Sequence, residues 1–242
     1  MREEFLPPAV CLLSGGMDSA VCLAEAHEQG FAPHALSFSY GQRHKVELEA
    51  AARVARAGGA LAHRTVAIDL RALGGSALTA EVDVPKERLD EEIGEGVPVT
   101  YVPARNTVFL AVALGYAEIL GARDIYIGVN AVDYSGYPDC RPEFLRAFEA
   151  LAAVATAAGA EDGARFQVRA PLLDMTKGDI VRRAIELKVD LGLTHTCYDP
   201  HISAWGVVES CGTCDACLLR LKGFAEASTT DPIAYRSLSS SD

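Results

Sequence analysis

The sequence predicts an α/β protein in which a doubly wound parallel sheet is followed by a small C-terminal cysteine-rich segment. Three observations predict it. Strand patterns alternate with helix patterns over most of the chain, a glycine-rich turn joins the first strand to the first helix, and four of the seven cysteines lie between positions 197 and 217. Such alternation builds βαβ units whose parallel sheet is covered by helices on both faces. We therefore expect an α/β domain over 1–190 and a helical, cysteine-rich segment over 191–242 packed on it.

The elements follow from hydrophobic periodicity. Apolar runs predict strands at 8–13, 35–40, 64–69, 124–130 and near 166–170. Apolar residues at helical spacing predict helices at 18–29, 44–59, 105–121, roughly 142–158 and near 176–188. Residues 71–104 show no clear period and predict a long loop. The polar loops at 14–19, 40–44 and 130–141 follow strands, so they share the sheet edge where open α/β sheets bind ligands.

Composition limits the class of protein. Half of the 242 residues are hydrophobic, and no apolar run approaches the ~20 residues that a membrane helix needs. The N-terminal residues do not follow the pattern of a secretory leader, so we expect a cytoplasmic protein. The net charge is −11 and the Lys and Arg residues are dispersed. We therefore expect neither a membrane nor nucleic acid as a direct partner.

The glycine-rich turn reads Ser14-Gly15-Gly16-Met17-Asp18-Ser19. Glycine lets backbone N–H groups approach a ligand closely, and the N-terminus of the next helix adds partial positive charge, so the turn is suited to binding an anion. Neither the lysine of a Walker A loop nor the spacing of a dinucleotide-binding loop is present. On these residues alone, an ordinary strand-to-helix turn is the alternative.

Several strings together resemble a known family. SGGMDS resembles the PP-loop of the ATP pyrophosphatase superfamily, whose fold is that of the adenine nucleotide alpha hydrolases. YGQRHKVELEAA at 40–51, VPARNTVFL at 102–110, GVNAVDYSGYPDCRPEF at 128–144 and the cysteines at 197–217 narrow the resemblance. They are similar to the 7-cyano-7-deazaguanine synthases of queuosine biosynthesis, over nearly the whole chain.

The resemblance implies an ATP-dependent ligase that forms carbon–nitrogen bonds. The carboxylate of 7-carboxy-7-deazaguanine is adenylated with loss of pyrophosphate, and ammonia converts the acyl adenylate into the amide. A second adenylation, at the amide oxygen, leads to the nitrile, 7-cyano-7-deazaguanine. The site must exclude water so that ammonia attacks instead. We expect ATP, Mg²⁺ and Zn²⁺ as cofactors.

The resemblance also implies roles for individual residues. ATP is expected to bind the turn, at Leu13, Ser14, Gly15, Gly16, Met17, Asp18 and Ser19. Asp18, Arg105 and Lys177 are the expected catalytic residues, because Asp18 could help to hold Mg²⁺ and the two cations could neutralise phosphate or carboxylate charge. The expected substrate-binding residues are Tyr40, Arg43, Asn106, Asn130, Asp133, Tyr134, Asp139 and Arg141. A helix cap, loop packing and solvated cations are the structural alternatives for these side chains. Cys140 is not expected to be a nucleophile, since adenylation needs no covalent enzyme intermediate.

The cysteines near the C-terminus predict a metal site. Cys211, Cys214 and Cys217 have C-x-x-C spacing, and Cys197 lies upstream. Four thiolates suit a tetrahedral, structural Zn²⁺ site, although spacing alone leaves an iron–sulfur cluster as an alternative. The resembled family often has Trp and then Ser directly before its first zinc cysteine, whereas this chain has His195-Thr196. We expect His195 to be loop packing rather than a ligand.

Two other functions compete with this interpretation. One is a different PP-loop synthetase that forms an amide from another carboxylate. The other is a zinc-dependent RNA-binding protein, which the acidic balance and the intact SGGMDS string disfavour. The sequence leaves open the ammonia source, the order of binding, and the oligomeric state, with a homodimer among the options.

Overall fold

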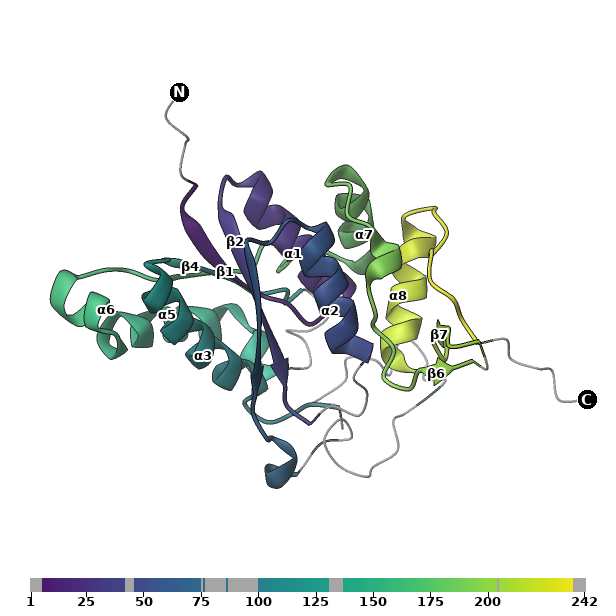
Figure 1. Cartoon of the computed structure of the whole chain (residues 1–242), viewed down its shortest axis with the longest axis horizontal. Coiled ribbons are helices and arrows are strands. Elements are labelled where there is room, and N and C mark those ends of the chain that lie inside the picture. Colours follow the sequence, from purple (N-terminus) through teal and green to yellow (C-terminus); the bar gives the residue numbers. More distant parts are fainter. Residues whose placement is uncertain are drawn as a thin grey trace, which may run out of the picture.

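The computed structural model describes residues 6–41, 46–74, 76, 86, 100–130, 137–203 and 205–236. Five parallel strands form the central sheet (Figure 1), and they are β1 (Pro8–Leu12), β2 (Ala32–Ser39), β3 (Ala62–Ala67), β4 (Asp124–Tyr126) and β5 (Gln167–Arg169). Their order is β3-β2-β1-β4-β5. The predicted α/β class and parallel sheet are confirmed.

The helices lie on both faces of the sheet, as a doubly wound fold requires (Figure 1). Helices α1 (Met17–Glu28) and α2 (Val46–Ala57) pack on one face through small residues such as Ala20 and Ala51. Helices α3 (Arg105–Leu120) and α5 (Pro142–Ala155) cover the other face through Leu110, Leu114 and Phe148. Helices α7 (Lys177–Glu186) and α8 (Asp215–Glu226) pack beyond α1 around Ile180 and Phe224.

The strand order places a ligand site beside β1. The chain runs outward from β1 through β2 to β3, and then returns to the other side of β1 as β4. Cys11 pairs with Ala35 of β2 on one side and with Tyr126 of β4 on the other. Neighbouring crossovers therefore diverge at the carboxyl end of β1, and such a reversal opens a crevice in doubly wound sheets. The glycine-rich turn leaves β1 at this point.

Two elements differ from the sequence prediction for identifiable reasons. The helix expected over 142–158 is two helices, α5 and α6 (Ala157–Asp162), because the Thr156 hydroxyl accepts a bond from the Gly159 N–H at 3.0 Å and starts a new helix. The strand expected over 124–130 ends at Tyr126. Beyond it, Gly128 passes so close to α1 that a Cβ there would lie 3.1 Å from the backbone of Asp18 and Ser19.

Short elements complete the described part of the chain. Single 3₁₀ turns are η1 (Arg71–Leu73), η2 (Pro138–Cys140) and η3 (Leu191–Leu193). Most of the predicted 71–104 loop lies outside the described residues. A small antiparallel hairpin, β6 (His201–Ile202) and β7 (Val208–Glu209), precedes α8. The division of the chain at residue 190 stays a prediction.

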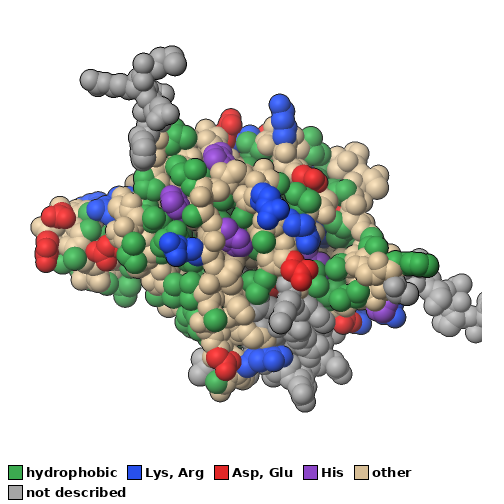
Figure 2. Space-filling model, in the orientation of Figure 1, with side chains coloured by type: hydrophobic (Ala, Val, Ile, Leu, Met, Phe, Trp, Pro, Cys, Tyr) green, Lys and Arg blue, Asp and Glu red, His purple; other side chains and the backbone are tan. Residues whose placement is uncertain are grey.

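The surface agrees with the acidic composition. On the face shown in Figure 2, Lys and Arg side chains lie among Asp and Glu side chains rather than in one band. None of the helices in the described ranges is both long enough and apolar enough to cross a bilayer.

Candidate active site and four-cysteine cluster

The glycine-rich turn is held by its own hydroxyl groups. Ser19 Oγ accepts from the Ser14 N–H at 3.2 Å and donates to the Gly16 carbonyl at 3.0 Å. The Ser14 hydroxyl oxygen lies 3.1 Å from Ser19 Oγ. No side chain caps α1, which starts after Gly16. The N–H groups of its first turn are therefore available to an anionic ligand, as the sequence predicts.

Asp18 is fixed by two side chains from distant parts of the chain. Lys177 Nζ donates to Asp18 Oδ2 at 2.6 Å, and Asn130 Nδ2 donates to the same oxygen at 3.2 Å. The other oxygen, Oδ1, is buried and accepts no hydrogen bond in the structure. The sequence prediction grouped these three residues in one site, and the structure places them in direct contact.

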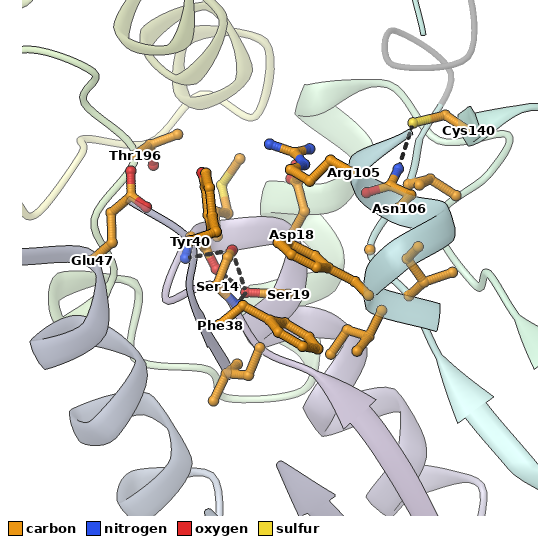
Figure 3. Close-up of a pocket in the computed structure, with 18 of the residues that line it drawn as sticks. Ser14, Asp18, Ser19, Phe38, Tyr40, Glu47, Arg105, Asn106, Cys140 and Thr196 are labelled. Atoms are coloured by element: carbon orange, nitrogen blue, oxygen red, sulfur yellow. Dashed lines mark hydrogen bonds between the residues drawn. The ribbon is translucent and has the colours of Figure 1, made fainter. Parts of the chain in front are cut away.

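A cavity of about 260 Å³ opens above the turn (Figure 3). Its walls come from the ends of β1, β2 and β4, from the starts of α1, α2 and α3, and from residues 195–198. The predicted site residues that line it are Leu13, Ser14, Gly16, Met17, Asp18, Ser19, Tyr40, Arg105 and Asn106. Phe38 and Phe109 stack with 4.0 Å between ring centroids and form an aromatic wall.

Other predicted residues lie around this cavity or away from it. Gly15 packs against α2, and Asn130 is fully buried beside Asp18. Asp139 is buried and accepts the Asn106 N–H at 2.9 Å, so its carboxylate caps α3. Arg141 is exposed at the start of α5 and does not line the cavity. Arg43, Asp133 and Tyr134 lie outside the described residues.

Burial tunes the ionisable groups that line the cavity. Burial raises the pKa of the Glu47 carboxyl to about 7, although the nearby Arg105 opposes this shift. Burial also raises the pKa of the Tyr40 phenol. Burial disfavours the charge of Arg105, but the nearby phenols and the Cys140 thiol together outweigh burial and raise the pKa of the guanidinium. The cavity therefore holds a permanent cation and a carboxyl group whose pKa is raised to about 7.

The four predicted cysteines form one buried cluster. The Sγ atoms of Cys197, Cys211, Cys214 and Cys217 lie within 4.8 Å of one another, and those of Cys211 and Cys217 are 3.9 Å apart. Zn–S bonds of about 2.3 Å in a tetrahedron require Sγ atoms ~3.8 Å apart. The N–H groups of Cys211 and Asp199 donate to Cys197 Sγ at 3.2 and 3.3 Å, which favours a thiolate. Hydrogen bonds from its cysteine neighbours lower the pKa of Cys214 far below its usual value. The donor set, its burial and its dimensions all fit Zn²⁺.

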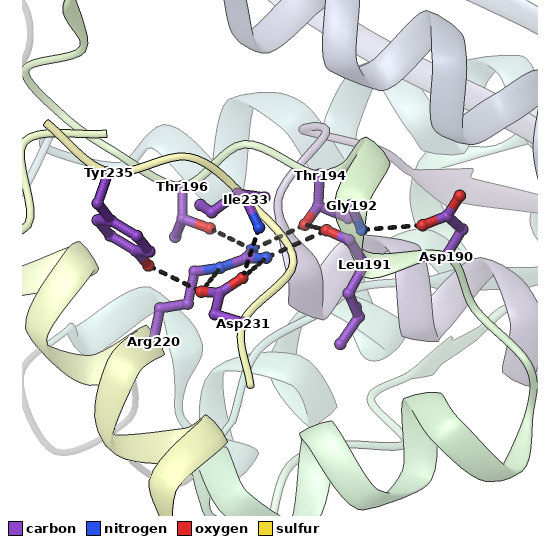
Figure 4. A network of polar contacts seen from close by, with 9 residues as sticks. All are labelled: Asp190, Leu191, Gly192, Thr194, Thr196, Arg220, Asp231, Ile233 and Tyr235. Atoms are coloured by element: carbon purple, nitrogen blue, oxygen red, sulfur yellow. Dashed lines mark hydrogen bonds and ion pairs between the residues drawn. The ribbon is translucent and has the colours of Figure 1, made fainter. Parts of the chain in front are cut away.

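A buried arginine ties this cluster to the cavity wall (Figure 4). Arg220, on α8, forms a bidentate ion pair with Asp231 at 2.7 and 2.9 Å. Its Nη1 also donates to the hydroxyls of Thr194 at 2.7 Å and Thr196 at 3.1 Å. Thr196 lines the cavity next to the first cysteine of the cluster. The C-terminal segment therefore positions one wall of the site.

The sequence prediction missed three residues that line the cavity. His195, which was expected to be loop packing, is one of them. Its backbone N–H donates to the Gly15 carbonyl at 2.8 Å, and its ring Nε2 lies 3.0 Å from the Cys197 carbonyl oxygen, so it also packs within its loop. Glu47 and Thr196 also line the cavity and were given no role. Glu47 stands in the string YGQRHKVELEAA, whose resemblance to the family was a usable signal, whereas nothing local marks Thr196.

Comparisons with known proteins identify the family to which the chain is similar. The model of the family described as queuosine biosynthesis protein QueC matches residues 8–228. The chain is 60% identical to the 7-cyano-7-deazaguanine synthase of Geobacter sulfurreducens over 227 residues, which cover 94% of this chain and 92% of that protein. It is 59% identical to the same enzyme of Paramagnetospirillum magneticum over 232 residues, covering 96% and 100%. Among solved structures, the NMN synthetase of Francisella tularensis is 18% identical with a TM-score of 0.48, covering 80% of this chain and 66% of that one.

Proposed function

The chain belongs to the QueC family of queuosine biosynthesis proteins, and we propose on this premise that it converts 7-carboxy-7-deazaguanine and ammonia into 7-cyano-7-deazaguanine at the expense of ATP. The site observation that carries the proposal is the uncapped, glycine-rich start of α1, which opens into a cavity faced by Arg105. Such a turn suits the pyrophosphate that leaves when a carboxylate attacks the α-phosphate of ATP.

The cavity residues support a role in adenylation. The first-turn N–H groups of α1 and the hydroxyls of Ser14 and Ser19 would hold the phosphates. Arg105 would pair with a phosphate or with the substrate carboxylate, because a planar guanidinium makes bidentate contacts with both. Tyr40, Phe38 and Phe109 offer flat surfaces for the two ring systems. We keep Asn106, Asn130, Asp139 and Arg141 as proposed substrate residues, with Asn130 and Asp139 acting through the groups that they position.

Asp18 is the residue that would hold Mg²⁺ with the ATP phosphates. Its Oδ1 is buried without a hydrogen-bond partner, and carboxylate oxygen is the ligand that Mg²⁺ prefers. The ion would neutralise charge on the phosphates during adenylation. Lys177, at 2.6 Å from Oδ2, keeps the Asp18 carboxylate in place and adds positive charge beside the turn.

Zn²⁺ would be held by Cys197, Cys211, Cys214 and Cys217 as a structural ion. Four thiolates leave no open coordination position, so the ion would bind no water for chemistry. Its role would be to fix the segment that carries Thr196 and Arg220. No disulfide joins any of the seven cysteines, all of which lie in the described part of the chain, and this supports a reducing, cytoplasmic setting.

Product analysis tests the proposal. The protein is incubated with 7-carboxy-7-deazaguanine, ATP, Mg²⁺ and ammonium, and products are identified by mass spectrometry and nucleotide chromatography. We expect the amide and then the nitrile, with AMP and pyrophosphate as the nucleotide products. A Ser14→Ala variant should fold but turn over on the order of 10²-fold more slowly, since one phosphate contact is lost. ADP as the sole nucleotide product, or conversion of a different carboxylate only, would reject the proposal.

A further inference from the structure

The cavity holds one carboxylate that the proposed adenylation does not use. Among the residues that the structure describes, Asp18 and Glu47 are the two acidic side chains that line it. Asp18 accepts hydrogen bonds from Lys177 and Asn130 through its Oδ2 atom, and its Oδ1 atom is the one proposed to hold Mg²⁺. Glu47 lies in the first turn of α2, and its carboxylate points into the cavity beside Thr196 (Figure 3). No described residue makes a hydrogen bond or an ion pair to this carboxylate.

The position of Glu47 is fixed by the turn itself. Gly15 packs so closely on the first turn of α2 that a Cβ there would lie 2.5 Å from the Glu47 carbonyl oxygen. The backbone of Glu47 is therefore held against the turn, and its carboxylate, which has no hydrogen-bond partner among the described residues, is a site for a small cation or for a hydrogen-bond donor. Arg105, which also lines the cavity, attracts anions. The cavity therefore has one wall with a negative charge, at Glu47, and one with a positive charge, at Arg105.

The proposed reaction requires such a group after adenylation. Near neutral pH ammonia is present mostly as ammonium, whose nitrogen has no free electron pair. We propose, on the basis of the proposed function, that Glu47 binds the incoming ammonium ion and accepts its proton. An N–H bond of ammonium breaks and an O–H bond forms on Glu47. The nitrogen pair then forms the C–N bond to the acyl carbon, the C–O bond to the phosphate breaks, and AMP leaves with that electron pair. A second N–H bond of the attached nitrogen breaks, and its proton passes to the departing phosphate or to water, which leaves the neutral amide.

The neighbouring groups favour Glu47 for this step. Its pKa, raised to about 7 by burial, makes the ionised form a better proton acceptor than an ordinary carboxylate. The groups that face it are Arg105 from α3, which stays charged, and Tyr40 from the end of β2, whose raised pKa keeps its proton in place. His195 has its Nε2 at 3.0 Å from the Cys197 carbonyl oxygen, so this nitrogen carries a proton and cannot take another.

Two partial reactions of Glu47→Gln test the role with the full-length, zinc-containing protein. The first is the exchange of labelled pyrophosphate into ATP that depends on the carboxylic acid substrate, 7-carboxy-7-deazaguanine. This acid-dependent exchange reports adenylation and requires no ammonia. The second is amide formation, with either ammonium or hydroxylamine as the nucleophile. Hydroxylamine is largely neutral near pH 7, so its nitrogen needs no proton acceptor before it attacks the acyl adenylate to give a hydroxamate. Glu49→Gln, an exposed acid on the same helix turn, is the matched control.

We expect Glu47→Gln to keep pyrophosphate exchange and hydroxamate formation within a few-fold of the wild type, while its ammonium-dependent rate falls by about 10²–10⁴. Glu47→Asp should recover part of that rate, and Glu49→Gln should match the wild type. Equal losses with both nucleophiles, loss of exchange, or an unchanged ammonium-dependent rate would each overturn the inference. A wild-type protein without acid-dependent exchange would instead refute the proposed function, and the inference with it.

Discussion

Replacement of Gly15 by alanine tests how tightly the glycine-rich turn is packed. Gly15 has a φ of +89°, and a Cβ there would lie 2.5 Å from the Glu47 carbonyl oxygen and 2.6 Å from the Ala51 nitrogen. Both neighbours are backbone atoms of α2, so they cannot rotate away as a side chain could. The left-handed conformation costs an alanine about 1–2 kcal/mol, and the forced overlap costs about 1–3 kcal/mol more. We therefore expect Gly15→Ala to lower the free energy of unfolding by about 2–5 kcal/mol.

Two other glycines separate these contributions. Gly121 ends α3 with a φ of +70°, but a Cβ there would meet nothing within 4 Å, so Gly121→Ala should cost only about 1–2 kcal/mol. Gly16 has a φ of −78°, and its Cβ would approach no closer than 3.4 Å, to Ser14 Oγ. Gly16→Ala should therefore change the stability by only about 0.5 kcal/mol, despite its place in the same turn.

Urea unfolding followed by circular dichroism, without ATP and with zinc present, measures all three variants. The expected order of destabilisation is Gly15→Ala, then Gly121→Ala, then Gly16→Ala. The reasoning fails if Gly15→Ala is no less stable than Gly121→Ala, because the contact with α2 would then carry no cost. It also fails if Gly16→Ala is as unstable as Gly15→Ala.

Three further predictions concern the contacts around the cavity. Lys177→Met removes the cation at 2.6 Å from Asp18. Pyrophosphate exchange into ATP in the presence of 7-carboxy-7-deazaguanine should therefore fall on the order of 10²–10³-fold, while a melting curve shows a folded protein. Unchanged exchange would contradict a role of Lys177 in adenylation. Asp231→Asn breaks the ion pair with Arg220, in which the Asp231 side chain is 4% exposed and the Arg220 side chain 1%. It should lower the free energy of unfolding, measured in urea titrations, by about 3–5 kcal/mol. A loss of unfolding free energy no larger than that from breaking an exposed ion pair would show that the network of Arg220 and Asp231 contributes little to stability. Cys214→Ser should lower both the zinc content and the melting temperature, because metal binding is coupled to folding, whereas Cys11→Ser should leave the zinc content unchanged; metal analysis beside melting curves decides between them.

The features that the sequence predicts well are those that local residues determine. The turn at Ser14 to Ser19 is held by its own hydroxyls and by glycine, so its string alone indicates its form. The four cysteines form their cluster because three of them lie within seven residues at the start of α8.

The features that it predicts less well depend on packing between distant segments. The sequence did not indicate that Asp139 caps α3, which it does because Ala104 at the start of that helix has no side chain that can do so; its role toward substrate stays a prediction. Glu47 joins the cavity only because α2 packs against Gly15. Thr196 is positioned by Arg220, which lies 24 residues later in the chain.

The wall formed by residues 195–198 has a consequence for how the protein is made. During synthesis the glycine-rich turn and the first strands leave the ribosome well before this wall, and Arg220 and Asp231, which hold it, emerge later still. The nascent chain can therefore form part of its sheet before it has a closed pocket. Interrupted translation products that end before Cys211 would carry the turn without Arg220 and Asp231, which hold this wall in place.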